Sequence, residues 1–465
     1  MGHDMKIWTE AYMERNMALI HKNSNGAIGK IVVLDDDPTG VQTVSGVSVY
    51  TDWSLDSIRE GFAEREELFF ILTNSRSFTQ DETVRVHREI SSRLVQVSKE
   101  TGLDFLVICR GDSTLRGHYL VEPETVAATL DEETHLPVDA EIYCPCFFEC
   151  GRITEGNVHY LMDGAQKIPV SQTEFAKDKT FGFNNSDMGK YIEEKTEGRY
   201  RAGDCLFINA GQPDTEQRLM AASGRRKIVV NASDYKSLKK FCETFRLCIM
   251  RGKRFVVRSA SSFVKAVGDF PEQPYLRREQ LRCTNSKNGG IILIGSHVSR
   301  TTAQLANLKA SGLPVQMIEF QVDNMLQAGG LEKEADRVLA LMEKAVARGQ
   351  DTAVYTSRQV LAPAGMSKEE ILKLSVSVSD ALTGLISRLK TAPSYIVAKG
   401  GITSSDVGTK ALRVRRARVM GQVKPGVPVW MTGPECRFPQ MPYIIFPGNV
   451  GEEGTLTEIA KILRS

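Results

Sequence analysis

The sequence of 465 residues lacks long apolar runs and an excess of either charge. No stretch of about 18 uncharged apolar residues occurs, so we expect no membrane-spanning helix. The segment from Met1 to Lys30 carries charges throughout and has no apolar core of the kind found in signal peptides. Basic and acidic residues nearly balance, leaving a net charge of +2, which argues against nucleic acid or an acidic membrane as the main partner.

Cysteine is scarce and does not follow a disulfide pattern. The chain has nine cysteines, an odd number, and no secretion signal, which indicates reduced thiols and a cytoplasmic protein. Cys144, Cys146 and Cys150 lie close together, but no second pair of cysteines or histidines stands at a usual zinc spacing. We interpret them as buried or half-buried thiols, and the sequence assigns no metal-ligating residue.

Two common nucleotide-binding motifs are also missing. The chain contains no Walker A sequence of the form Gly-x4-Gly-Lys-Ser/Thr, and no Gly-x-Gly-x-x-Gly follows a predicted strand. A nucleotide site in this chain must therefore be of another type. With 42% hydrophobic and 25% charged residues, the composition is that of a globular protein, and the length predicts two or three domains.

Three consecutive carboxylates follow the first predicted strand. Residues 31–34 are apolar and mostly β-branched, which predicts a buried strand, and Asp35, Asp36 and Asp37 come directly after it. Pro38 cannot continue a ladder of strand hydrogen bonds, so the strand ends here. Like charges this close together require cations, hydrogen-bond donors or solvent. The alternative interpretation of these three residues is a solvated acidic turn.

Further predicted strands end in polar clusters. Residues 68–72 lead into Thr73-Asn74-Ser75-Arg76-Ser77, and residues 105–109 lead into Arg110-Gly111-Asp112-Ser113-Thr114-Leu115-Arg116-Gly117. Strands that alternate with helices predict a mostly parallel sheet, and such sheets bind ligands at the carboxyl ends of their strands. Arginine forks can bind a carboxylate, and aspartate can accept a hydroxyl proton, so this edge suits a small hydroxylated anion.

A second series of strands and helices begins near residue 290. Residues 291–294 lead into Gly295-Ser296-His297, residues 395–398 into Lys399-Gly400-Gly401-Ile402-Thr403, and residues 443–446 into Pro447-Gly448. Turns before helices offer free backbone N–H groups to phosphates, although a Gly-Gly turn can also serve geometry alone. We expect the basic run Arg413, Arg415, Arg416 and Arg418 to lie on the helix after Gly401, outside the site.

These observations predict an α/β protein of two domains, each with a mostly parallel sheet flanked by helices, and an active site in the cleft between them. The expected boundaries are an N-terminal extension at 1–27, a substrate domain at 28–268, a linker at 269–289 and a nucleotide-binding domain at 290–465. Phosphoryl transfer from a nucleotide to a hydroxyl suits such an arrangement, because it depends mainly on positioning and charge neutralisation.

The order of the motifs resembles the four-carbon acid sugar kinase family. The resemblance covers nearly the whole chain after residue 28. Many family members have Ala-Asp-Asp-Leu-Thr-Gly at the first motif, whereas this chain has Asp35 and Pro38, which indicates a distinct branch with Asp-Asp-Asp-Pro-Thr-Gly. The matching motifs are residues 36–40, 73–77, 112–117, Pro145, Gly151-Arg152, 173–176, Gly295-Ser296, 399–404, 421–423, 425–428 and Gly448.

The resemblance implies an ATP-dependent kinase, assisted by Mg2+, that phosphorylates a hydroxyl of threonate, erythronate or a 3-oxo-tetronate. The first domain would bind the sugar acid, through Asp36, Asp37, Arg76, Arg110, Gly111, Asp112, Ser113 and Arg116. The second would bind ATP, through Ser296, Lys399, Gly400, Gly401, Ile402, Thr403 and Gly448. We expect Asp37 to be the general base, with Asp36 and Asp112 as alternatives, and Arg76 to clamp the substrate carboxylate.

Two other interpretations stay open. A dehydrogenase or isomerase of similar acids is disfavoured because the chain has no dinucleotide-binding fingerprint. A sugar-acid sensor without catalysis is disfavoured because Asp36, Asp37, Asp112 and the Gly400-Gly401 turn are all present. The sequence leaves the oligomeric state open, and a homodimer is one of the states it allows.

Overall fold

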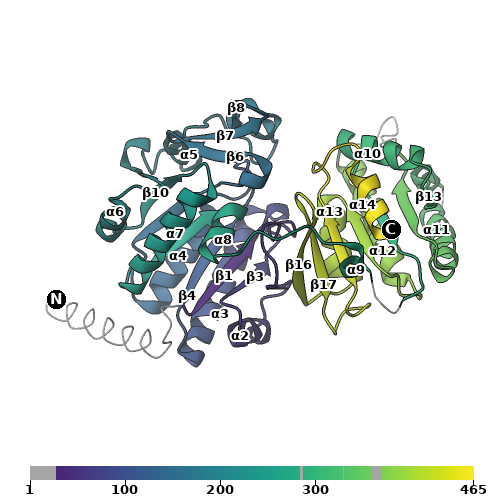
Figure 1. Ribbon diagram of the computed structural model, residues 1–465, viewed down its shortest axis with the longest axis horizontal. Helices are drawn as coiled ribbons and strands as arrows, with labels where there is room; N and C mark the ends of the chain where they lie inside the picture. Colours follow the sequence, from purple (N-terminus) through teal and green to yellow (C-terminus); the bar gives the residue numbers. More distant parts are fainter. Residues whose placement is uncertain (1–27, 283–285, 328, 359–367, 465) are drawn as a thin grey trace. The chain divides into compact units, whose positions relative to one another are not determined.

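Figure 1 shows the computed structural model of the chain, which divides into two compact units, Met1–Pro271 and Glu272–Ser465. The structure describes residues 28–282, 286–327, 329–358 and 368–464, so the extension expected at 1–27 lies outside the described residues. Each unit has a mostly parallel β-sheet flanked by helices. This confirms the predicted two-domain α/β fold.

The strands of unit 1 pair in parallel in the order β2-β3-β1-β4-β11-β5-β10-β9. β1 lies between β3 and β4, and all six of its residues are buried, which explains its continuous apolar run. The bounds are β1 Lys30–Asp35, β2 Ser48–Tyr50, β3 Leu68–Leu72, β4 Phe105–Arg110, β5 Ala140–Cys144, β9 Leu206–Asn209, β10 Arg226–Asn231 and β11 Phe255–Ser259.

The helices of unit 1 pack their apolar faces on this sheet. In α3, Val86, Ile90 and Leu94 recur at helical spacing and join the core formed with β1, β3 and β4. A capping box of Thr79 and Glu82 begins α3 and left-handed Gly102 ends it. The bounds are α2 Leu55–Ala63, α3 Gln80–Thr101, α4 Val121–Thr134, α5 Met188–Lys195, α6 Thr215–Ala221, α7 Tyr235–Met250 and α8 Ser261–Val267.

A small antiparallel sheet interrupts the alternation after β5. It consists of β6 Arg152–Glu155, β7 Val158–Asp163 and β8 Gln166–Pro169. An isolated bridge between Thr154 and Ala232 links it to the chain just after β10. The sequence did not predict these strands, because they are short and lack an apolar run.

In unit 2 the strand order is β13-β14-β12-β15-β18-β17-β16. The first five pair in parallel, and β17 and β16 continue in antiparallel fashion from β18. The strand bounds are β12 Ile291–Ile294, β13 Gln316–Phe320, β14 Thr352–Thr356, β15 Ile396–Lys399, β16 Arg416–Lys424, β17 Val427–Thr432 and β18 Pro442–Phe446. The helices are α9 Arg278–Leu281, α10 Ser299–Ala310, α11 Gly330–Ala347, α12 Lys368–Arg388, α13 Gly401–Asp406 and α14 Thr455–Arg464.

The segment from 269 to 289, predicted as a linker, contains α9, whose Leu281 is buried in the core of unit 2. The prediction that Arg413, Arg415, Arg416 and Arg418 lie on the helix after Gly401 is wrong. Arg416 and Arg418 belong to β16, where they alternate with buried Ala417 and Val419, and Arg413 and Arg415 lie in the segment before this strand.

Thiols and membrane-spanning helices can be assessed for the part of the chain that the structure describes. Its eight cysteines are all free; seven of them are buried and Cys150 is half-buried. No described helix combines the length and the apolar character that crossing a membrane requires.

Candidate active site

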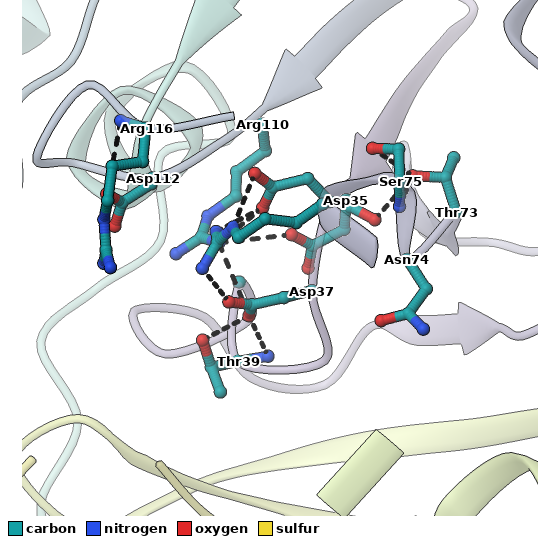
Figure 2. A network of polar contacts seen from close by, with 12 residues as sticks. Asp35, Asp37, Thr39, Thr73, Asn74, Ser75, Arg110, Asp112 and Arg116 are labelled. Carbon is teal, nitrogen blue, oxygen red and sulfur yellow. Dashed lines mark hydrogen bonds and ion pairs between the residues drawn. The ribbon is translucent and has the colours of Figure 1, made fainter. Parts of the chain in front are cut away.

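The carboxyl ends of β1, β3 and β4 meet at one edge of the sheet in unit 1 (Figure 2). Asp35 pairs in register with Leu72 on one side and with Arg110 on the other. The backbone N–H of Asp36 donates to the carbonyl of Arg110 at 3.2 Å, and the N–H of Arg76 donates to the carbonyl of Asp36 at 3.3 Å. The parallel register therefore brings these acidic and basic side chains together.

Arg76 holds two of the three carboxylates. Its Nε and Nη2 donate to the two carboxylate oxygens of Asp36 at 3.1 and 2.6 Å, and its Nη1 lies 2.5 Å from Asp37 Oδ2. All three nitrogens of its guanidinium group are thus engaged with protein carboxylates. In this arrangement, Arg76 has no free fork for a substrate carboxylate.

Arg110 is buried beneath the same cluster. Its Nη1 lies 3.3 Å from Asp35 Oδ1, 3.5 Å from Asp36 Oδ1 and 3.8 Å from Asp37 Oδ1, and its Nη2 donates to Ser261 Oγ at 3.2 Å. Two guanidinium groups therefore face three carboxylates, which leaves the cluster with a surplus of negative charge when all three are ionised.

The three carboxylates differ in pKa and in exposure. Burial raises the pKa of Asp35 and of Asp36 above the usual value. Burial acts in the same sense on Asp37, but Arg76, Arg110 and hydrogen bonds from Thr39 outweigh it and lower the pKa. The Asp37 side chain is 20% exposed, against 2% for Asp35 and 1% for Asp36. Asp37 is thus the ionised carboxylate of the cluster that a ligand can reach.

Asp112 lies in the loop after β4 and is held by its own neighbours. It accepts hydrogen bonds from the Thr114 hydroxyl, from Arg116 Nε at 2.8 Å and from the Arg116 backbone N–H at 3.4 Å. Burial opposes ionisation of Asp112, but Arg116 and Arg76 hold its pKa well below the usual range. The loop reaches the first cluster, because a Cβ at Gly117 would lie 3.2 Å from Asp36 Oδ2.

A buried ion pair contacts the residues that follow β3 and β4. Arg258 on β11 pairs with Glu122 on α4, and Ser75 Oγ donates to Glu122 Oε1 at 2.7 Å. A Cβ at Gly111 would lie only 2.1 Å from Arg258 Nη2, so this position has room for glycine alone. Sequence reasoning missed Arg258 and Glu122, although Arg258 lies near the carboxyl end of an apolar strand, as Arg110 does.

In unit 2, the side chain of Lys399 points into the protein. Its Nζ donates to the carbonyls of Pro447 at 2.6 Å and Gly448 at 3.2 Å, and it lies 3.7 Å from the centre of the Phe446 ring. Burial, with a smaller effect from Arg300, lowers the pKa of Lys399 to about 7. The lysine therefore orders the turn after β18 from inside.

The turns after β12, β15 and β18 converge around Ser296. A Cβ at Gly400 would lie 3.1 Å from Ser296 Cβ, and one at Gly448 would lie 2.8 Å from Ser296 Oγ. Gly400 has φ 129° and ψ 143°, a conformation that favours glycine. A Cβ at Gly401 would meet nothing within 4 Å.

Three further residues belong to this region. Predicted Thr403 lies beside the turn, because a Cβ at Gly400 would be 3.1 Å from its Oγ1, and predicted Ile402 is 71% exposed. Arg358, which sequence reasoning missed, donates from Nη2 to the carbonyl of Ser296 at 2.8 Å. The converging turns thus leave an open backbone surface at Gly401 beside small and polar side chains.

Comparisons with known proteins agree with this division of the chain. Residues 31–267 match the model of a sugar-binding N-terminal domain, and residues 291–456 match that of a nucleotide-binding C-terminal domain. The chain belongs to the four-carbon acid sugar kinase family. In this chain, the carboxylate cluster lies in the part that matches the sugar-binding domain, and the converging turns lie in the part that matches the nucleotide-binding domain.

Three known proteins resemble this chain at low sequence identity. A 3-oxo-tetronate kinase from Cupriavidus necator is 24% identical over 332 residues, which span 69% of this chain and 70% of that protein. A solved structure from Salmonella typhimurium LT2 has 16% identity and a TM-score of 0.65, covering 92% of this chain and 98% of its own. Another solved structure, from Haemophilus influenzae, has 17% identity and a TM-score of 0.60, and it covers 93% of this chain and 100% of its own. The two structures show a shared fold.

Proposed function

We propose that the protein is an ATP-dependent kinase that phosphorylates a hydroxyl of a four-carbon sugar acid of the threonate, erythronate or 3-oxo-tetronate type. The observation that carries the proposal is Asp37, an accessible carboxylate with a lowered pKa inside a sugar-binding domain. The match of unit 2 to a nucleotide-binding domain and the distant 3-oxo-tetronate kinase support the reaction class.

In this reaction Asp37 acts as the general base. The substrate hydroxyl transfers its proton to a carboxylate oxygen of Asp37, and the hydroxyl oxygen forms a bond to the γ-phosphorus of ATP. The bond from that phosphorus to the bridging oxygen breaks, and ADP leaves with the electron pair. Arg76 and Arg110 hold Asp37 in place, and Thr39 fixes its orientation with a backbone N–H bond of 2.7 Å.

Asp36 and Asp112 have supporting roles in this proposal. Asp36 is almost fully buried and bound by both cluster arginines, so it positions Arg76 and Arg110. Asp112 orders the loop that carries Gly111, Ser113 and Arg116, which would line the sugar acid. These assignments make Asp37 the one aspartate of the three that exchanges a proton with substrate.

The nucleotide phosphates would rest on the converging turns of unit 2. Ser296, Thr403 and the backbone at Gly400, Gly401 and Gly448 would contact them, since glycines allow close approach and α13 begins at Gly401. Ile402 would offer an apolar contact at the edge. We assign Lys399 a positioning role, because its ammonium group is engaged with carbonyls of the turn after β18.

Mg2+ is expected to accompany the nucleotide. Among the described residues, no group of three or more His, Cys, Asp or Glu side chains is arranged to hold a metal ion. In kinases Mg2+ is bound largely by phosphate oxygens and water, with one or two carboxylates, and it neutralises charge on the phosphates. We therefore assign no residue of this chain as a dedicated metal ligand.

An ADP-release screen against threonate, erythronate and their 3-oxo forms tests the function. We expect ADP release that depends on one of these acids in the wild type and that is nearly abolished in Asp37→Asn. Binding of an acid without ADP release would favour a sensor, and acid-dependent reduction of a nicotinamide nucleotide would favour a dehydrogenase. A cytoplasmic location stays a prediction of the sequence, which fractionation would test, and the oligomeric state, which the sequence leaves open, is measured in solution.

A further inference from the structure

Arg152 follows the carboxyl end of β5 and has no acidic partner among the described residues. At the carboxyl edge of unit 1, Arg76, Arg110, Arg116 and Arg258 each form an ion pair with at least one carboxylate. Arg152 forms no ion pair with any described residue. Its Nη1 donates to the carbonyl of Cys150, and its Nε is buried without a hydrogen-bond partner. A half-buried guanidinium group in this state retains unsatisfied donors and an uncompensated charge.

Backbone hydrogen bonds link Arg152 to the segment that holds Arg110. Arg152 begins β6, and its N–H and carbonyl exchange 2.9 Å hydrogen bonds with Phe147 in the loop after β5. The next residue in that loop, Phe148, donates its N–H to Ser262 Oγ at 2.9 Å. Ser261, the residue before Ser262, accepts a hydrogen bond from Arg110 Nη2. The loop that carries Arg152 is therefore fastened to the segment that holds Arg110.

The face of β6 that carries Arg152 is connected to the loop that contains Asp112. Side chains two residues apart in a strand share a face, so Arg152 and Thr154 lie on one side of β6. Thr154 Oγ1 lies 2.9 Å from His159 Nδ1, and His159 Nε2 lies 2.8 Å from the carbonyl of Ser113. A carbonyl only accepts hydrogen bonds, so Nε2 carries the proton and Nδ1 accepts from Thr154.

Charge effects agree with this placement. Burial lowers the pKa of His159 to about 4, and the charges of Arg152 and Asp112 both act on it. The charges of Arg152 and Arg110 likewise both act on the Cys150 thiol, whose pKa is raised mainly by burial. Arg152 thus acts on one group that Asp112 also influences and on another that Arg110 also influences.

We propose that Arg152 is the residue that binds the carboxylate of the sugar acid. A carboxylate is the planar, doubly accepting anion that a guanidinium group without an acidic partner binds best. The other arginines of the edge are neutralised by Asp35, Asp36, Asp37, Asp112 and Glu122, which would repel an acid in the absence of a further cation. This inference rests on the proposed function, and it replaces Arg76 by Arg152 as the clamp.

The test compares an acid with the polyol that lacks its carboxylate. Threonate and threitol, or erythronate and erythritol, are assayed by ADP release with the wild type, Arg152→Lys and Arg152→Met. We expect Arg152→Met to raise the KM for the acid about 10- to 100-fold, the range for lost hydrogen bonds to a charged group. The KM for ATP and the weak activity on the polyol should stay unchanged. Arg152→Lys keeps the charge but loses the fork, so its KM for the acid should lie between those of the wild type and Arg152→Met.

Arg85→Met is the matched control, because this arginine is 70% exposed on α3. It should leave the preference for acid over polyol at the wild-type value. Thermal unfolding checks that each variant folds, and if Arg152→Met does not fold, Arg152→Lys decides. An unchanged preference for the acid in a folded Arg152 variant overturns the inference while leaving the kinase proposal intact.

Calorimetry separates this inference from the proposed function. If the wild type releases no ADP with any tetronate, the function fails, and titration of threonate or erythronate into the wild type and Arg152→Met still tests the clamp. Binding that is lost in the Arg152 variant supports the inference. Equal binding to both proteins, or no binding to the wild type, overturns it.

Discussion

Lys399 should make the stability of unit 2 depend on pH. Its ammonium group is buried with backbone carbonyls as partners, and burial lowers its pKa from the model-compound value of 10.5 to about 7. The perturbation is Lys399→Met, which removes the titrating group and keeps the length and apolar character of the stem. The quantity of interest is the free energy of unfolding of unit 2 as a function of pH.

The sign follows from the two pKa values. Between pH 7 and 10.5 the unfolded chain holds the proton of Lys399 while the folded chain has released it, so the free energy of unfolding rises with pH. Below pH 7 the full cost of burying the charge is present. One pKa unit corresponds to about 1.4 kcal/mol, so stability should rise by roughly 2 kcal/mol between pH 7 and 9.

Tryptophan fluorescence can report on unit 2 alone. The chain has three tryptophans, and replacing Trp8 and Trp53 by phenylalanine leaves Trp430, which is fully buried in unit 2. Urea unfolding at pH 7, 8 and 9, with Lys or Met at position 399, gives the difference in stability, in which the other titrating groups cancel. The reasoning is refuted if the two proteins show the same change in stability from pH 7 to 9.

Three further substitutions test the two sites. Asp37→Asn should lower turnover by roughly 10²–10⁴, measured by ADP release, while calorimetry still detects the sugar acid; near-normal turnover would remove Asp37 as the base. Gly401→Val should fold, since nothing lies within 4 Å of the new Cβ, but should lose ATP binding in calorimetry and keep acid binding. Gly40→Ala places a Cβ 2.0 Å from both Asp35 carboxylate oxygens and should destabilise unit 1 by about 1–3 kcal/mol in thermal unfolding, whereas Gly203→Ala, which faces open space, should not.

The position of the first carboxylate cluster could be predicted because its cause is local. An apolar strand that ends in Asp35, Asp36 and Asp37 identifies a carboxyl edge, and parallel pairing brings the neighbouring strand ends to the same edge. What the sequence could not give is the pairing among side chains. Arg76 was expected to bind substrate, yet it forms its fork with Asp36, because the register of β1 and β3 sets the distance.

Two kinds of feature escaped prediction for physical reasons. Arg258 and Glu122 are 136 residues apart, and their contact depends on β11 inserting between β4 and β5, which no local pattern reveals. Arg416 and Arg418 were assigned to a helix because they follow α13. Their alternation with Ala417 and Val419 is the period of a strand, and that signal could have identified β16.

The burial of the thiols has a consequence for the chemistry that the protein can withstand. Oxidants and alkylating reagents attack the thiolate of an accessible cysteine, and seven of the eight described thiols are buried. Burial also raises the pKa of the remaining one, Cys150, so little thiolate is present there at neutral pH. Although Cys150 borders Arg152, the proposed sugar-acid site is therefore insulated from reagents that act through the described thiols as long as unit 1 stays folded.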